Sequence, residues 1–117
     1  MNLNEIAKKL DLELLTPEIA GDSAEDITHG YASDLLSDVL ANAPRGGVLV
    51  TVQVHLNVVA VAVHAELAGV IFASGRRPEP SVCAKAIEEG IVLLVSEEPA
   101  FDVVGKLYAL GFRGAHE

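Results

Sequence analysis

Short apolar runs that alternate with helix-like segments are the feature that most constrains how this chain can fold. Three runs stand out, namely Val48–Val54, Val70–Ala73 and Ile91–Val95. A continuous apolar strand is typical of a parallel sheet that is covered on both faces. From Ser33 onward these runs are separated by segments with helical spacing. The sequence therefore predicts an α/β fold: a three-layer α/β/α domain with a largely parallel sheet.

Five segments are predicted to form the helices of this domain. The first has apolar residues spaced three and four apart, as on one face of a helix. Three of the others end at proline or glycine, which commonly follow a helix. The predicted helices cover residues 3–10, 33–43 and 57–67, the stretch from Pro80 to Gly90, and the stretch from Pro99 to Gly111. Residues 16–25 are predicted as a loop and residues 27–32 as a short strand.

The segment 57–67 is ambiguous, because its valines suit either a strand or a fully buried helix. Strand propensity alone would favour a hairpin at this point. The length of the segment, its alanines and a predicted cap at Asn57 favour a helix. We therefore expect a helix that is buried on most of its surface.

Two of the predicted helices carry a marked set of apolar residues. In the earlier one, Ser33 is the predicted N-cap and Asp34 lies in the first turn. Its apolar stripe comprises Leu35, Leu36, Val39, Leu40 and Ala43. In the last helix, the residues expected to point inward are Val103, Val104, Leu107 and Leu110.

Acidic residues outnumber basic ones, and this balance excludes two classes of partner. The 117 residues include 17 acidic and 8 basic side chains, which gives a formal net charge of −9. Binding to a phosphate backbone needs clustered basic side chains, and this sequence offers no more than isolated pairs such as Arg76–Arg77. We therefore expect no nucleic-acid binding and no binding to an anionic membrane surface.

Length and cysteine content indicate a single cytoplasmic domain. A chain of this size builds one core, so residues 1–117 are expected to form one domain. The single cysteine, Cys83, rules out an internal disulfide and fits a reducing compartment. The N-terminus lacks the basic and then apolar order of a signal peptide. The apolar region 56–73 contains Asn57, His64 and Glu66, so we predict a buried helix and strand there rather than a membrane span.

Polar side chains near the carboxyl ends of the predicted strands are the candidate ligand-binding residues. Ligands of open α/β sheets gather at this edge, where helix N-termini and an arginine would suit a phosphate or carboxylate. The candidates are Gln53, His55, Asn57 and Arg76, with Thr28, His29 and Ser33 approaching from the first half of the chain. In the alternative interpretation, Gln53, His55 and Asn57 simply cap and satisfy backbone groups.

We predict no catalytic residues, no metal and no cofactor. His29 and His55 could converge in space, but no metal-ligand spacing supports a metal site. The glycines at 46–47 and 75 do not form the loop that cradles nucleotide phosphates. Cys83 is more simply a small core residue than a nucleophile.

Two motifs in the first half of the chain resemble the signature of the DRTGG domain, a small α/β module of regulatory proteins. One is Asp26-Ile-Thr-His-Gly30, in which Ile27 stands where the family has arginine and His29 where it has the first glycine. The other is the Ser-Asp-Leu-Leu start of the helix 33–43. The segments 51–57 and 58–62 are also similar to the family.

The second half of the chain resembles the N-terminal domain of bifunctional HPr kinase/phosphorylase. The similarity follows an apolar strand and lies in Gly75-Arg-Arg-Pro-Glu-Pro80 and Gly90-Ile-Val-Leu-Leu94. In that enzyme the catalytic phosphate-binding loop belongs to a separate C-terminal domain, and this sequence has no such loop. The N-terminal domains of Mur ligases share the same fold class, which agrees with the three-layer architecture expected here.

The resemblance implies a non-catalytic regulatory module that self-associates, as a homodimer, and binds a small ligand or a partner protein. A nucleotide or another phosphorylated metabolite is the small ligand that it implies. The helix 33–43 and the apolar helix after Asn57 are the candidate interface elements. The alternative is a phosphotransfer-related enzyme or an HPr-kinase-like protein, which the lack of a Walker A loop disfavours.

Overall fold

A computed structural model describes residues 1–19 and 26–114 of the chain, and the predicted loop at 16–25 lies partly outside them. The helices within the described residues are α1 (Leu3–Leu10), α2 (Leu36–Asn42), α3 (Asn57–His64), α4 (Pro80–Glu89) and α5 (Ala100–Ala109). The strands are β1 (Glu13–Leu14), β2 (Gly30–Ala32), β3 (Val48–Thr51), β4 (Gly69–Phe72) and β5 (Val92–Val95).

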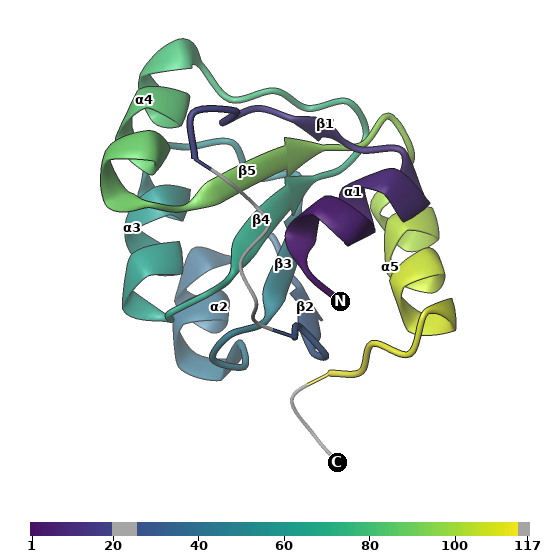
Figure 1. Cartoon of the computed structure of the whole chain (residues 1–117). Coiled ribbons are helices and arrows are strands. Elements are labelled where there is room, and N and C mark those ends of the chain that lie inside the picture. Colours follow the sequence, from purple (N-terminus) through teal and green to yellow (C-terminus); the bar gives the residue numbers. More distant parts are fainter. Residues whose placement is uncertain (20–25, 115–117) are drawn as a thin grey trace.

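The strands form one sheet in the order β1-β5-β4-β3-β2 (Figure 1). β2, β3, β4 and β5 run parallel to one another, in a register that sets Val50 beside Ile71 and Ile71 beside Leu94. β1 pairs with β5 in the antiparallel direction. The largely parallel sheet predicted from the apolar runs is therefore confirmed, and β2 forms one of its edges.

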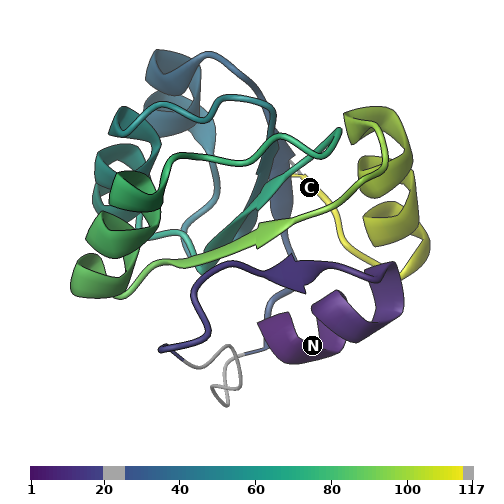
Figure 2. The same cartoon turned by 90° about the horizontal axis from the view of Figure 1, so that it is seen from above.

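Helices cover both faces of this sheet (Figure 2). α2, α3 and α4 each connect two neighbouring parallel strands and lie on one face, whereas α1 and α5 lie on the other. Successive side chains of a strand point to opposite faces. In β3, Val48 and Val50 pack in the core with α1 and α5, while Leu49 packs in the core with α2, α3 and α4. The predicted three-layer α/β/α architecture is therefore confirmed.

Local sequence signals explain several of the element boundaries. Asn2 and Glu5 form a capping box at the start of α1, since each side chain accepts a hydrogen bond from the other residue's backbone N–H. Pro80 is the first residue of α4, where its missing N–H costs nothing. Gly90 ends α4 with a φ of 77°, a conformation that glycine adopts without strain. The segment after Leu56 is a helix, so the hairpin alternative is wrong.

The start of α2 differs from the prediction. Leu35 occupies the N-cap position without a side-chain hydrogen bond, so Ser33 does not cap the helix. The Ser33 hydroxyl instead accepts a hydrogen bond from the Leu35 backbone N–H at 3.2 Å. Val39 is fully buried as predicted, but Leu35 and Leu40 are exposed.

Two further expectations need correction, and one strand was not predicted. Asn57, the predicted cap of α3, is its first helical residue, and Leu56 precedes it without a side-chain cap. Val104 and Leu110 on α5 are exposed rather than inward-facing, because Val103 and Leu107 alone bury their side chains against the sheet there. The short strand β1 was not predicted, since two residues carry no periodic signal.

Within the described residues, no helix has the length and apolar character needed to cross a membrane.

Candidate functional site

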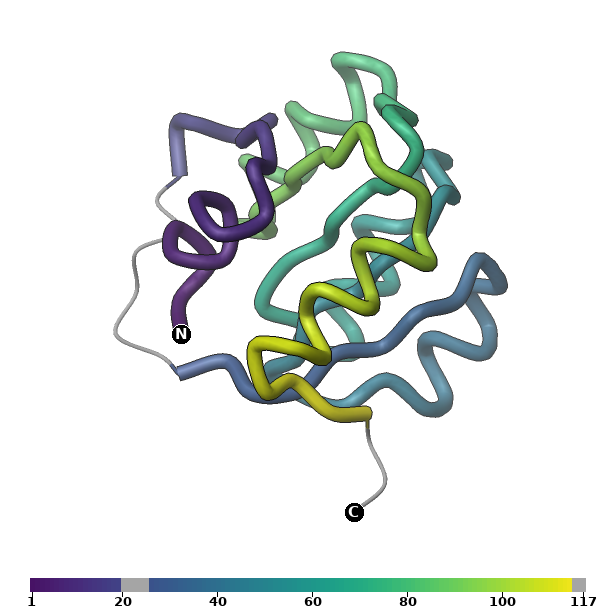
Figure 3. The backbone as a smooth tube through the Cα atoms, turned by 90° about the vertical axis from the view of Figure 1, so that its right-hand side faces the viewer, coloured from purple at the N-terminus to yellow at the C-terminus, as the bar shows by residue number. Residues whose placement is uncertain are grey.

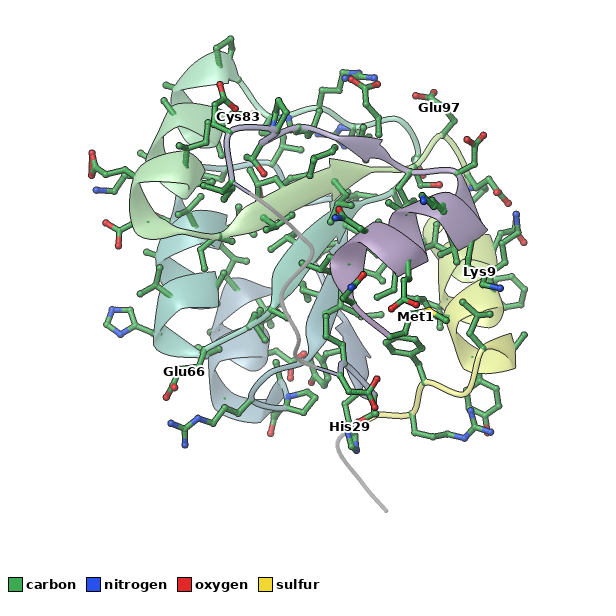
Figure 4. All side chains as sticks on the ribbon, in the orientation of Figure 1. Met1, Lys9, His29, Glu66, Cys83 and Glu97 are labelled. Atoms are coloured by element: carbon green, nitrogen blue, oxygen red, sulfur yellow. The ribbon has the colours of Figure 1, made fainter. Side chains whose placement is uncertain are left out.

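The predicted ligand-binding residues lie at two opposite edges of the sheet. Those at the carboxyl ends of the parallel strands are Ser33, Gln53, His55, Asn57 and Arg76, and those at the amino ends are Thr28 and His29. Figure 4 shows His29 at one end of the molecule and Glu97, which follows β5, at the other. His29 and His55 therefore do not converge, because the length of the strands separates the two edges.

The polar side chains after β3 bind backbone groups of their own loop. Thr51 Oγ1 accepts a hydrogen bond from the backbone N–H of Gln53 at 3.0 Å. Gln53 Oε1 accepts from His55 at 3.1 Å, and His55 Nδ1 accepts from Asn57 at 3.0 Å. Each bond spans two residues, so the loop is a succession of side-chain turns. For Gln53 and His55 the geometry matches the alternative interpretation, because their side chains satisfy backbone groups of the loop. A ligand role for these residues and for Asn57 stays a prediction.

Asp34 connects this loop to the end of β2. Its Oδ1 accepts a hydrogen bond from Thr51 Oγ1 at 2.9 Å and from the backbone N–H of Val52 at 2.8 Å. Bonds to an ionised carboxylate are among the stronger hydrogen bonds in proteins. Asp34 therefore stabilises the contact between β2 and β3 at their carboxyl ends, although Asp34 was predicted to favour the start of a helix.

Ligands of open α/β sheets usually bind where the connections switch from one face to the other, which here is between β4 and β5. The loops after these strands bind each other at that point. Ser74 N–H donates to the Glu98 carbonyl at 2.7 Å. Gly75 N–H donates to the Ser96 carbonyl at 2.7 Å, and a β-carbon on Gly75 would lie 2.8 Å from Glu97 Oε1. The two loops therefore close this crevice themselves.

A pocket of about 230 Å³ lies between β2 and α5. Gly30 and Ala32 form its floor, and they face α5 because Val48 and Val50 beside them do so. A hydrogen atom and a methyl group fill little of the space below the helix. The wall on the α5 side includes Val104, Leu107 and Tyr108. The pocket therefore exists because small residues of an edge strand lie opposite large residues of α5.

Arg113 brings a positive charge to this pocket. Its guanidinium carbon lies 3.6 Å from the centroid of the Tyr108 ring, a cation–π contact. Its Nη1 also donates hydrogen bonds to the carbonyls of Tyr108 at 3.0 Å and Phe112 at 2.7 Å. These bonds hold the guanidinium over the ring. The pocket therefore combines an apolar, partly aromatic lining with a fixed cation.

The Asp-x-Thr-x-Gly motif lies directly beside this pocket. Ile27, which stands where the DRTGG family has arginine, is buried in the core with α1 and α5. His29 forms a parallel bridge with Arg113. In this bridge Gly30 N–H donates to the Arg113 carbonyl at 2.9 Å, and Arg113 N–H donates to the Thr28 carbonyl at 3.2 Å. Thr28 and His29 are therefore neighbours of the pocket rather than of the carboxyl-terminal edge.

Sequence reasoning missed the pocket, because it sought polar residues at strand ends. The residues that shape it belong mostly to β2, to α5 and to the segment that directly follows α5. Two signals were available in the sequence: the small residues Gly30 and Ala32 in a predicted strand, and Tyr108 followed by Arg113 near the C-terminus. Neither signal indicates a site until the fold brings the two segments together.

A hydrogen-bonded cluster joins β2 to α2 on the opposite face. Tyr31 donates its hydroxyl to both carboxylate oxygens of Asp38 at 2.9 Å, and Asn42 Nδ2 donates to one of them at 2.8 Å. Hydrogen bonding from Ser33, Tyr31 and Asn42 holds the pKa of Asp38 below its ordinary value. The same bond to the carboxylate raises the pKa of the Tyr31 hydroxyl. The backbone of Tyr31 thus belongs to the floor strand of the pocket, while its side chain fixes that strand to α2.

No protein-family model matches the chain, and no curated protein matches its sequence. Among solved structures, it is similar to the CBS and DRTGG domains of the regulatory region of Clostridium perfringens pyrophosphatase, a crystal structure complexed with the activator diadenosine tetraphosphate. The sequence identity is 14% and the TM-score 0.67. The match covers 90% of this chain and 45% of that chain, so this chain spans less than half of its length. The likeness concerns the fold alone, and it shows that this chain is an α/β domain similar to part of that structure.

Proposed function

We propose that this chain is a non-catalytic regulatory module that binds a small ligand in the pocket between β2 and α5. The observation that carries the proposal is the apolar pocket with Arg113 fixed beside it. An apolar, partly aromatic lining suits a planar ring of a ligand. Polar groups at the mouth of a pocket usually orient the ligand. A guanidinium is well suited to a phosphate or carboxylate on that ring.

The size of the pocket limits which part of a ligand can enter. Its volume of about 230 Å³ is below the range of roughly 300–1,000 Å³ that is typical for drug-sized ligands. We therefore infer that one ring enters, while an anionic group remains outside near Arg113. A nucleotide or another phosphorylated metabolite has this combination of groups.

The structural neighbour supports a nucleotide as the ligand. That regulatory region is complexed with diadenosine tetraphosphate, which carries adenine rings and phosphates. At 14% identity the likeness concerns the fold, so the chemistry of the pocket is the independent argument for this chain. We therefore propose both that the chain belongs to the DRTGG family and that its ligand is a nucleotide.

We also propose that the module self-associates. Leu35 and Leu40 on α2 are exposed in the isolated chain, and burial of such side chains is favourable. Val39, which shares this helix, is fully buried and belongs to the core instead. The exposed face of α2 is therefore the candidate interface, in agreement with the expectation that helix 33–43 takes part in a dimer.

The alternative, a phosphotransfer-related enzyme, would need groups that bind a metal or phosphates. Within residues 1–19 and 26–114, no group of three or more His, Cys, Asp or Glu side chains is placed to hold a metal ion. Cys83 has a raised pKa because burial disfavours its thiolate, which makes it a poor nucleophile. Turnover of ATP by the purified chain would nevertheless favour the enzyme over the binding module.

The proposal predicts that adenine nucleotides raise the thermal unfolding midpoint of the chain. A ligand at a hundredfold its dissociation constant adds about 2.7 kcal/mol to the free energy of unfolding. For a domain of this size the midpoint should rise by roughly 10 °C. ATP, AMP and diadenosine tetraphosphate are suitable probes.

The variant Gly30→Val tests whether any such shift comes from the pocket. Valine suits a strand, and a β-carbon at this position has its nearest neighbour at 3.4 Å, so the fold accommodates it. Its side chain would occupy the pocket and should abolish the shift. Gly105→Ala is the matched control, since a β-carbon there meets nothing within 4 Å. A flat response of the wild type, or an equal shift in Gly30→Val, would contradict the proposal.

A further inference from the structure

The solvent-facing side of α5 carries apolar side chains that the fold leaves uncovered. Val103 and Leu107 are the residues of this helix that pack against the sheet. Phe101, Val104 and Tyr108 are spaced three and four apart, so they form a row on another side of the helix. Phe101 is 87% exposed and Tyr108 58% exposed, and neighbouring exposed apolar residues of this size commonly mark an interaction surface. Figure 3 views the chain from this side, and no other described segment is drawn over α5.

Two opposite charges lie beside this row. Asp102 and Lys106 are four residues apart, so they share one flank of α5. Lys106 nevertheless pairs with Glu98. The side chain of Asp102 has no hydrogen bond or ion pair within residues 1–19 and 26–114. A lysine ammonium has three donors, so Lys106 can bind a second carboxylate in addition to Glu98. One flank of α5 therefore offers both a carboxylate and an ammonium to a partner.

The apolar row and the two charges have nearly the same midpoint along the helix. Positions 101 and 108 are symmetric about a point between residues 104 and 105, and positions 102 and 106 are symmetric about residue 104. The two midpoints differ by half a residue, which is about 0.8 Å of helix rise. A twofold axis at this point, perpendicular to two antiparallel copies of α5, sets Phe101 of one copy against Tyr108 of the other. The same axis sets Asp102 against Lys106, so this face of α5 is complementary to itself.

We propose that α5 binds the α5 of a second copy of this chain in the antiparallel direction. The contact has apolar residues at its centre and two ion pairs along one border. Charges that flank an apolar seam select the partner and the orientation of paired helices in the same way. A parallel pair would place the flanks that carry the charges on opposite borders of the contact, where Asp102 and Lys106 do not meet. The local charges therefore favour a second copy of the chain in the antiparallel arrangement.

This contact goes beyond the small-ligand function and is distinct from the interface proposed on α2. α2 and α5 lie on opposite faces of the sheet, so one chain can use both contacts at once (Figure 2). Phe101, Asp102 and Lys106 are not among the residues that line the pocket. Substitutions at these three positions therefore test the contact without changing the lining of the ligand site.

Two charge-reversal variants test the contact, with Leu40→Glu present in every chain to remove the interface on α2. Asp102→Lys alone would set two lysines against each other, and Lys106→Asp alone would set two aspartates against each other. In each case the association constant should fall by about tenfold or more. An equimolar mixture of the two variants restores both opposite-charge pairs between unlike chains. Sedimentation velocity should therefore show monomers for each variant alone and dimers for the mixture at the same total concentration.

Lys85→Asp on α4 is the matched control, because Lys85 is also an exposed helical lysine that pairs with a glutamate of its own chain. It should associate like the chain that carries Leu40→Glu alone. Phe101→Ala, which removes the apolar end of the row, should weaken the association. Because restored dimers in the mixture require folded variants, misfolding of either variant cannot imitate the expected result.

Three results would overturn the proposal. The first is a Leu40→Glu chain that is monomeric at every concentration, which would leave a different protein as the occupant of the α5 surface. The second is association that both charge-reversal variants retain. The third is a mixture that is as monomeric as its components. No ligand takes part in these measurements, so their failure leaves the small-ligand function standing, and the absence of a nucleotide-induced thermal shift leaves the α5 contact standing.

Discussion

Asp38 connects α2 to β2 through a carboxylate whose pKa lies below its ordinary value. Hydrogen bonds from Ser33, Tyr31 and Asn42 cause this shift. Because the pKa is lower in the folded chain than in the unfolded one, the ionised carboxylate stabilises the fold. This contribution is complete above the unfolded value, 3.8, and is lost as the pH falls through the lowered folded value.

The variant Tyr31→Phe should therefore destabilise the chain in a pH-dependent way. At pH 7 it removes a hydrogen bond to an ionised carboxylate, so the free energy of unfolding should be lower than that of the wild type. The difference should begin to shrink as the pH falls below 3.8, where the carboxyl of the unfolded chain becomes protonated, and should vanish below the lowered pKa of Asp38 in the folded chain. Urea unfolding at pH 7 and pH 3 measures this difference in the free energy of unfolding between the variant and the wild type.

Tyr108→Phe is the matched control for this measurement. Tyr108 is exposed, and its hydroxyl has no hydrogen bond within the described part of the chain. Its replacement should leave the stability unchanged at both pH values. An equal destabilisation by Tyr31→Phe at pH 7 and pH 3 would show that the loss comes from packing rather than from the carboxylate.

At the scale of single elements, α2 separates a core face from an exposed apolar face. Val39 is fully buried, whereas Leu35 is 65% exposed and Leu40 52% exposed. A charge at Val39 would unfold the chain and would say nothing about an interface. A charge at Leu40 instead alters only the surface of the folded chain.

Leu40→Glu should accordingly weaken self-association while leaving the fold intact. A buried, unpaired charge at an interface is unfavourable, so sedimentation velocity should show a shift toward the monomer. Ala41→Glu, at the exposed neighbouring position, introduces the same charge and should leave the oligomeric state unchanged. A wild-type chain that is monomeric at every concentration, or a Leu40→Glu variant that sediments like the wild type, would contradict self-association through α2.

A helix or strand could be predicted from the sequence where its own residues carry the pattern that indicates it. The apolar runs that became β3, β4 and β5 are buried on both faces, and Pro80 and Gly90 mark the ends of α4. β1 could not be predicted, because its two residues form a strand only by pairing with β5.

The candidate site was less predictable, because tertiary contacts between distant segments create it. Gln53 and His55 were selected for their chemistry, yet they bond to their own loop. Gly30 and Ala32 were not selected, since their side chains have no functional groups that would indicate a binding site. Their significance depends on the passage of α5 above β2, which no local pattern indicates.

At the scale of the whole molecule, the path of α5 decides where a ligand can bind. α5 follows β5 and crosses the sheet to reach β2, on the face opposite α2, α3 and α4 (Figures 1 and 2). The loops after β4 and β5 bond to each other and close the usual crevice. The apolar space therefore lies at the other side of the sheet, where α5 meets the small residues of the edge strand.

The most direct test of this account is a nucleotide titration of isotope-labelled chain, followed by the amide resonances in NMR spectra. Diadenosine tetraphosphate is the probe. The account predicts that the largest shifts occur at Gly30, Ala32, Tyr108 and Arg113, around the pocket. Shifts confined to residues 53–57 and 74–77 would instead locate the site at the carboxyl ends of the strands and would contradict the account, as would a spectrum that does not change.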